Sequence, residues 1–198
     1  MDSDSKLSFK VVLLGHSHVG KTCLVKKLIT GEFDPETETT INATYSVYDV
    51  EFEKQTVQLQ IWDTAGEEKF QKFAPIYYHG AFGALVIYDI TDNYSFTRAK
   101  FWINELYRNG SPDVIIILVG NKLDRESERT VNEEEVQKYA DENSLYHIQS
   151  SAKTGENVAD SFRALAKKIL ESKKLSRNNI RVDDDDDDNL KKKKQGCC

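Results

Sequence analysis

The stretch FKVVLLGHSHVGKT, residues 9–22, decides the fold. Its first half, FKVVLLG (9–15), is mostly apolar and ends in glycine, which is typical of a buried strand. The second half has the spacing G-x-x-x-x-G-K-[ST] and leads into the helical pattern GKTCLVKKLIT (20–30). Between a strand and a helix, this spacing indicates a loop whose backbone N–H groups bind phosphate. An ordinary strand-to-helix turn would not need Lys21, which can reach the β- and γ-phosphates, and Thr22, which can offer its hydroxyl to Mg²⁺, in register.

Strand and helix patterns alternate along the rest of the chain. Residues 44–52 and 55–63 alternate apolar and polar side chains like half-buried strands, and EKQT (53–56) between them favours a hairpin. Further strands are expected at 83–89, 113–120 and 144–151, and helices at 95–110, 132–143 and 157–174. Ser95 and Asn132 are the expected helix caps, and Gly110 the expected stop.

This alternation predicts an α/β fold with one P-loop domain. We expect a six-stranded, mostly parallel sheet with one antiparallel edge strand and about five helices on both faces. Ligands of such sheets bind beyond the carboxyl ends of the strands, and each motif described here follows a strand. The length of 198 residues suits one domain, expected at 8–175, between a flexible N-terminus at 1–7 and a disordered tail at 176–198.

Charge and cysteine content narrow the class of protein. The net charge is −6, and because the acidic and basic side chains of the tail cancel, the folded part carries it, which argues against a nucleic-acid partner. Cys23, Cys197 and Cys198 form neither a disulfide framework nor a metal-ligand spacing, so a reducing compartment is expected. The N-terminal MDSDSK resembles neither a signal peptide nor a myristoylation site, and no apolar run is long enough to cross a bilayer.

Two later motifs favour guanine as the base. In GNKLD (120–124), the Asp124 carboxylate can accept hydrogen bonds from both the guanine N1–H and the exocyclic amine, a donor pair that adenine lacks. Asn121 would tie this loop to the phosphate loop, and the stem of Lys122 could cover one face of the base. Asn-Lys-x-Asp alone is a common surface tetrad, but it follows a P-loop here at a suitable distance. SSAKTG (150–155) would add the Ala152 N–H near guanine O6, with Lys153 packing nearby.

In this order, GHSHVGKT, WDTAGEE, GNKLD and SAK resemble the Ras superfamily of small GTPases, and within it the Rab family. The resemblance covers residues 8–175 and the C-terminus, and AP-x-YY-x-GA within FAPIYYHGAFGALVIYDIT (73–91) is most similar to the early-endosomal Rab subgroup. The segment DRESERTVNEEE is too short for the insert of Rho members, and the N-terminal helix of Arf members is missing. The resemblance implies a single P-loop GTPase domain that binds GTP or GDP with Mg²⁺ and hydrolyses GTP.

The resemblance also assigns the site residues. Thr22, Thr40 and Asp63 would hold Mg²⁺, and Lys21, Gly66 and Glu67 would act in hydrolysis. The nucleotide would be bound by Ser17, His18, Val19, Gly20, Lys21, Thr22, Cys23, Phe33, Thr40, Gly66, Asn121, Lys122, Asp124, Ser151, Ala152 and Lys153. Tyr45, Trp62 and Tyr77 match the aromatic triad that Rabs present to effectors, although such residues also pack in cores. Loss of the γ-phosphate would release both switch segments.

Glu67 stands where the family usually has the glutamine that orients the attacking water. An ionised glutamate has no donor, is a poor base at neutral pH, and adds negative charge to an anionic transition state. Intrinsic hydrolysis is therefore expected to be slow, by roughly 5- to 150-fold relative to a protein with the usual glutamine. The alternative is that Glu67 turns to solvent and a helper protein supplies the missing group.

Two further residues differ from the family pattern, and one cysteine could be either structural or reactive. His18 replaces a glycine or alanine and could approach the γ-phosphate, but a solvent-facing position is preferred. Asn42 replaces a glycine, and asparagine tolerates positive φ. Cys23 is expected to be a small core residue and not a reactive thiol.

The tail DDDDDDNLKKKKQGCC ends in Cys197 and Cys198, which match the Rab ending that receives two geranylgeranyl groups. Two lipid chains give stable membrane anchoring where one gives marginal binding. Lys191–Lys194 could add about 1 kcal/mol each at an anionic leaflet, and Asp183–Asp188 would oppose them. We therefore hypothesise that the acidic run tunes membrane choice or extraction by a carrier.

The leading interpretation is a monomeric GTP switch for vesicle targeting on the cytoplasmic face of an intracellular, endosomal membrane, cycling with the cytosol. Its expected partners are an exchange factor, an activating protein, a dissociation inhibitor and effectors. The rival is a GTP-loaded effector-binding scaffold with negligible hydrolysis, for which Glu67 is the main argument. A P-loop ATPase or small-molecule kinase is disfavoured by GNKLD and SAK and by the lack of a lid domain.

Overall fold

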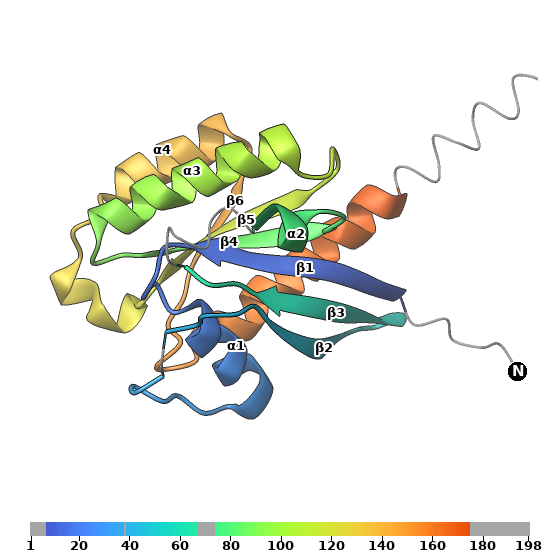
Figure 1. Cartoon of the computed structure of the whole chain (residues 1–198), viewed down its shortest axis with the longest axis horizontal. Coiled ribbons are helices and arrows are strands. Elements are labelled where there is room, and N and C mark those ends of the chain that lie inside the picture. The colour runs from blue at the N-terminus through green and yellow to red at the C-terminus, as the bar shows by residue number, and fades with distance from the viewer. Residues whose placement is uncertain (1–6, 38, 67–73, 175–198) are drawn as a thin grey trace, which may run out of the picture.

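A six-stranded sheet forms the centre of the molecule in the computed structural model, which describes residues 7–37, 39–66 and 74–174 (Figure 1). The strands are β1 (Leu7–Gly15), β2 (Thr44–Phe52), β3 (Gln55–Asp63), β4 (Gly83–Asp89), β5 (Ile115–Asn121) and β6 (Tyr146–Gln149). The helices are α1 (Lys21–Thr30), α2 (Ala74–Tyr78), α3 (Asn93–Asn109), the 3-10 helix η2 (Leu123–Glu128), α4 (Glu133–Glu142) and a C-terminal helix at 158–174.

The strand order is β2-β3-β1-β4-β5-β6, and only the β2–β3 pair is antiparallel. The strand β1 pairs with β3 on one side and with β4 on the other, so the loop that follows Gly15 emerges from the middle of the sheet. The parallel strands β1, β3, β4, β5 and β6 all end at the same edge, which brings the loops that follow them together. The predicted fold class is confirmed.

Each face of the sheet buries its own apolar core. One core lies between the sheet, α1 and the C-terminal helix, and includes Leu24 and Phe162. The other lies under α2, α3 and α4, and includes Tyr78, Trp102 and Val136. Because parallel strands with both faces covered bury nearly every side chain, β4 is buried at all its positions, as its continuous apolar sequence predicts.

The start of α3 differs from its prediction. The helix begins at Asn93, and its cap is Asp92, whose side chain accepts a hydrogen bond from the Tyr94 N–H at 2.9 Å. Ser95, the predicted cap, is buried in the first turn of the helix and donates to the Asp92 carbonyl at 2.7 Å. Aspartate and serine are both favourable cap residues, so the sequence alone does not separate them. The Asn132 cap of α4 is as predicted, since its side chain accepts from the Glu135 N–H.

Short elements escaped the pattern analysis. The five-residue helix α2 and the six-residue η2 are too short to show a helical period. The strand β6 covers only four residues of the predicted 144–151. Among the helices that the structure describes, none is long and apolar enough to span a bilayer.

Gly15, which ends β1 and opens the phosphate-loop motif, should tolerate a side chain poorly. Its φ is +151°, and a Cβ there would lie 2.3 Å from the Ile87 carbonyl oxygen, which β4 holds in place. Gly31 also has a positive φ, +73°, but nothing lies within 4 Å of its Cβ position. Backbone strain and overpacking together should lower the unfolding free energy of Gly15→Ala by about 4 kcal/mol, against about 1 kcal/mol for Gly31→Ala. Urea denaturation measures both, and equal losses would contradict the steric argument.

Candidate nucleotide site

A cavity of about 470 Å³ opens at the carboxyl edge of the sheet. It lies between the β1–α1 loop, the segment after α1, and the loops that follow β3, β5 and β6. Of the predicted site residues, it is lined by Ser17, His18, Gly20, Lys21, Thr22, Cys23, Phe33, Thr40, Gly66, Asn121, Lys122, Asp124, Ala152 and Lys153. Val19 and Ser151 are buried behind this lining. Residues scattered between positions 17 and 153 are therefore brought to one hollow.

Lys21 is the most deeply buried positive charge in the lining of this hollow, and only 5% of it is exposed. Its Nζ donates to the Gly15 carbonyl at 3.2 Å and to the His16 carbonyl at 2.8 Å. Burial lowers the pKa of Lys21 to about 8, while the charge of Asp63 opposes this shift. A Cβ on Gly66 would lie 2.5 Å from the His16 carbonyl oxygen and 2.6 Å from the Ser17 nitrogen, both backbone atoms, so the close approach of the two loops requires glycine there. The loop thus presents a desolvated ammonium, which favours an anionic ligand.

Three oxygen-bearing side chains meet next to Lys21. The Thr22 hydroxyl donates to Asp63 Oδ2 at 2.6 Å and lies 2.6 Å from the Thr40 hydroxyl. Burial raises the pKa of Asp63, whose Oδ1 has no hydrogen-bond partner among the described residues. Hydroxyl and carboxylate oxygens are hard donors that suit Mg²⁺, and such a cation or its waters would satisfy the carboxylate oxygen that lacks a partner. These are the residues predicted to hold Mg²⁺, and they fit it.

At the other end of the cavity, Asn121 joins three loops. Its amide Nδ2 donates to the Val19 carbonyl at 2.8 Å, which is the predicted tie to the phosphate loop. Its Oδ1 accepts from the Ala152 N–H at 3.1 Å, so this N–H, which was expected near guanine O6, already has a partner inside the protein. Ser151 donates to Asp124 Oδ1 at 2.6 Å, which orients the carboxylate that was predicted to recognise guanine. The Lys153 Nζ lies 3.9 Å from the other Asp124 oxygen.

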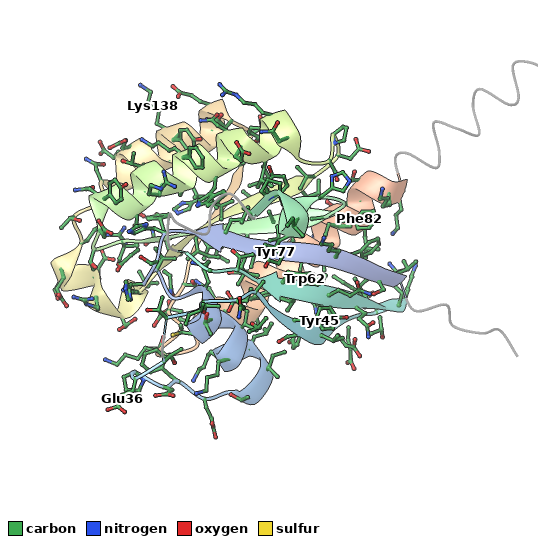
Figure 2. The ribbon with its side chains drawn as sticks, viewed as in Figure 1. Glu36, Tyr45, Trp62, Tyr77, Phe82 and Lys138 are labelled. Atoms are coloured by element: carbon green, nitrogen blue, oxygen red, sulfur yellow. The ribbon has the colours of Figure 1, made fainter. Side chains whose placement is uncertain are left out.

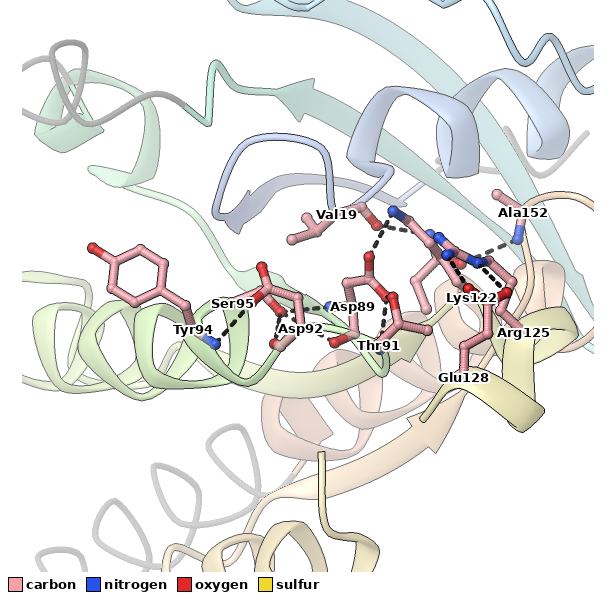
Figure 3. A network of polar contacts seen from close by, with 11 residues as sticks. Val19, Asp89, Thr91, Asp92, Tyr94, Ser95, Lys122, Arg125, Glu128 and Ala152 are labelled. Atoms are coloured by element: carbon pink, nitrogen blue, oxygen red, sulfur yellow. Dashed lines mark hydrogen bonds and ion pairs between the residues drawn. The ribbon is translucent and has the colours of Figure 1, made fainter. Parts of the chain in front are cut away.

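Sequence reasoning missed part of the site. Asp34, Pro35, Thr37, Thr39 and Arg125 also line the cavity. A further carboxylate, Asp89, forms an ion pair with Lys122 behind the lining (Figure 3). The signal that could have found it is the sequence GALVIYD, in which a charged residue ends a fully apolar strand.

The arrangement combines a phosphate loop, a divalent-cation set and a base pocket. The sequence model of the Ras family matches residues 10–171. The chain belongs to the Ras family. It is therefore a small GTPase of the Ras superfamily, and such proteins bind GTP or GDP with Mg²⁺ and hydrolyse GTP. When bound, Mg²⁺ would neutralise phosphate charge, with Thr22, Thr40 and Asp63 around it.

The remaining residues singled out in the sequence are placed as follows. His18 is exposed at the mouth of the cavity with a φ of 62°, so its backbone takes the conformation that favours glycine. Asn42 does not take a positive φ, so the reason considered for its tolerance does not apply. Cys23 is a half-buried free cysteine that lines the cavity and packs against one core. Glu67, Cys197 and Cys198 lie outside the described residues.

Tyr45, Trp62 and Tyr77, the predicted effector triad, form one aromatic cluster on the surface (Figure 2). The Tyr45 and Trp62 ring centroids are 5.5 Å apart, and those of Trp62 and Tyr77 are 6.1 Å apart. Tyr45 is 52% exposed, whereas Trp62 and Tyr77 also pack against a core. Surface display and core packing are thus both observed for this triad.

The buried Lys21 should give the nucleotide-free protein a measurable pH dependence. Between pH 8 and pH 10.5 the unfolded chain still holds the Lys21 proton that the folded protein has lost, so a rise in pH favours the folded state. The unfolding free energy of wild type minus that of Lys21→Met should therefore increase by about 3 kcal/mol across this range. Urea denaturation in EDTA, at several pH values, measures it. Parallel pH curves for the two proteins would contradict the lowered pKa.

Proposed function

We propose that this Ras-family protein is a Rab-type switch that regulates vesicular membrane trafficking from the cytoplasmic face of an endosomal membrane and cycles with the cytosol. In its GTP-bound state the monomer binds effectors, and in its GDP-bound state it releases them. An exchange factor loads it with GTP, an activating protein assists hydrolysis, and a dissociation inhibitor extracts it from the membrane.

The observation that carries the proposal is the register of the β2–β3 pair. Thr44 pairs with Asp63, and Tyr45 pairs with Trp62. The residue that fits Mg²⁺, Asp63, is therefore the immediate neighbour of an aromatic residue on the surface. Thr40, at the phosphate end, is only a few residues from Tyr45 along the chain. One residue that fits Mg²⁺ and two residues of the aromatic triad therefore lie on the same pair of strands.

The surface around the triad suits a protein partner. Ile41, Val47 and Ile76 are 64%, 42% and 70% exposed, and they lie in or beside the segments that carry Tyr45 and Tyr77. A cavity of about 230 Å³ lined by Ile41, Ala74 and Tyr77, among others, adjoins them. Exposed apolar side chains gathered near aromatic rings are typical of interaction surfaces.

Glu67 supports slow intrinsic hydrolysis, because an ionised glutamate has no hydrogen-bond donor and adds negative charge to an anionic transition state. It also favours a second candidate function, a GTP-loaded scaffold that binds effectors with negligible hydrolysis. The two candidates share the nucleotide site and differ in the rate constant of one step, so a single-turnover measurement separates them.

The Glu67→Gln variant should hydrolyse GTP faster than wild type. A glutamine can donate to one group and accept from another, and it removes a negative charge from the transition state. We expect a rise of roughly 5- to 150-fold in the single-turnover rate, measured with [γ-³²P]GTP on residues 1–176.

Glu67→Ala is the matched control, because it removes the charge without adding a donor. Equal, ordinary rates in wild type and Glu67→Gln would contradict slow hydrolysis. A wild-type rate indistinguishable from that of protein-free GTP would favour the scaffold.

The two C-terminal cysteines should contribute in steps to membrane binding. Full-length protein with one cysteine replaced by serine should lose most of its stable membrane fraction, and the Cys197→Ser/Cys198→Ser double variant should lose all of it. Cell fractionation measures this, with Gln195→Ser in the same tail as the control that should not change the distribution. Unchanged membrane association of the double variant would refute the lipid anchor.

A further inference from the structure

The carboxylate of Asp89 lies behind the base end of the nucleotide cavity. Asp89 is the last residue of β4 and is 6% exposed, and the strand pairing places it opposite Asn121. It is not among the residues that line the cavity. A buried carboxylate is expensive unless its oxygens are satisfied, so the partners of Asp89 indicate what it holds.

The two oxygens of Asp89 have different partners (Figure 3). Oδ1 accepts from both the backbone N–H and the hydroxyl of Thr91, each at 2.8 Å. Oδ2 lies 2.6 Å from the Nζ of Lys122. The hydrogen bonds from Thr91 fix the orientation of the carboxylate, so that its other oxygen, Oδ2, points at Lys122.

The backbone of Asp89 is fixed as well. Its N–H donates to the Ser95 hydroxyl at 2.9 Å, and Ser95 in turn donates to the Asp92 carbonyl at 2.7 Å. The backbone of Asp89, at the end of β4, is therefore attached to the first turn of α3. Such a support makes Asp89 a stiff anchor for a flexible side chain.

Lys122 needs this anchor because of its place and its chemistry. It lines the cavity between Asn121 and Asp124, with a left-handed φ of 71°. A lysine side chain has about 2 kcal/mol of rotamer entropy, because its four-carbon stem is flexible. Because Asp89 holds the ammonium, the stem has one position along the cavity wall, and binding a base against it does not have to order it.

We propose that Asp89 is a positioning residue for guanine-nucleotide binding, which acts by holding the Lys122 stem in place along the wall of the base pocket. The inference rests on the nucleotide binding of the Ras family, not on the proposed trafficking role. Hydrolysis and membrane assays can therefore fail without affecting it.

The test is the dissociation rate of tritiated GDP in excess unlabelled GTP, with Mg²⁺ present. Asp89→Asn keeps an oxygen for Thr91 and removes the charge that holds Lys122, so GDP release should become about tenfold faster, which corresponds to about 1.4 kcal/mol. Lys122→Met keeps an apolar stem and loses the ammonium. In the Lys122→Met background, Asp89→Asn should cause no further acceleration, because its target is already gone.

Glu135→Gln is the matched control. It removes the carboxylate charge from another ion pair, Lys100–Glu135 at 2.6 Å, whose residues do not line the cavity, so GDP release should stay within about twofold of wild type. The proposal is overturned if Asp89→Asn leaves the rate unchanged, if its effect multiplies with that of Lys122→Met, or if Glu135→Gln accelerates release equally.

A second measurement covers the case in which Asp89→Asn does not fold. In wild-type protein bound to GDP, the ¹⁵Nζ NMR signal of Lys122 can be assigned by its loss in Lys122→Arg. An ammonium held by Asp89 should give a separate signal with slow hydrogen exchange. A signal that merges with those of the surface lysines would overturn the proposal.

Discussion

The side chain of Asn121 is the contact on which the site depends. Its amide donates to the phosphate loop at Val19 and accepts from the base loop at Ala152, and the residue is 1% exposed. These loops follow β1 and β6, which are separated in the sheet by β4 and β5. Because a buried amide with both ends satisfied is costly to break, the phosphate and base ends of the cavity keep a fixed separation.

Opposite charges buried at the same edge of the sheet make the site dependent on its ligand. Burial lowers the pKa of Lys21 and raises that of Asp63, so each group resists its own charged form in the protein alone. A phosphate near Lys21 and a cation near Asp63 would each remove this cost. Anything that binds only the folded state stabilises it by mass action, so nucleotide should contribute strongly to the stability of the fold.

The sequence predicted the strands better than the hydrogen bonds and ion pairs that side chains make. The bounds of β2, β3 and β4 are those that alternation and apolar runs indicate, because those patterns depend only on which face is buried. The cap of α3 and the role of Asp89 could not be predicted in this way, because each depends on which polar atom meets which in space. Motif spacing found Asn121 and Asp124, because together they form the Asn-Lys-x-Asp motif that follows a P-loop. It missed Asp89, because a carboxylate that ends an apolar strand marks a position at the edge of the sheet but does not indicate which side chain it will meet.

The β2–β3 ladder restricts how the nucleotide can affect the surface. Strand pairing holds Tyr45 against Trp62. If Thr40 moved away from Thr22, the backbone change would therefore have to occur between Thr40 and the start of β2, within residues 41–43. Those residues belong to no strand, Ile41 is 64% exposed, and all of them border the cavity of about 230 Å³. The space beside them lets this segment move without disturbing a packed core, which would resist it. A change at the phosphate end would thus be concentrated at Ile41 and its neighbours, because strand pairing holds Tyr45 and Trp62 together beside them.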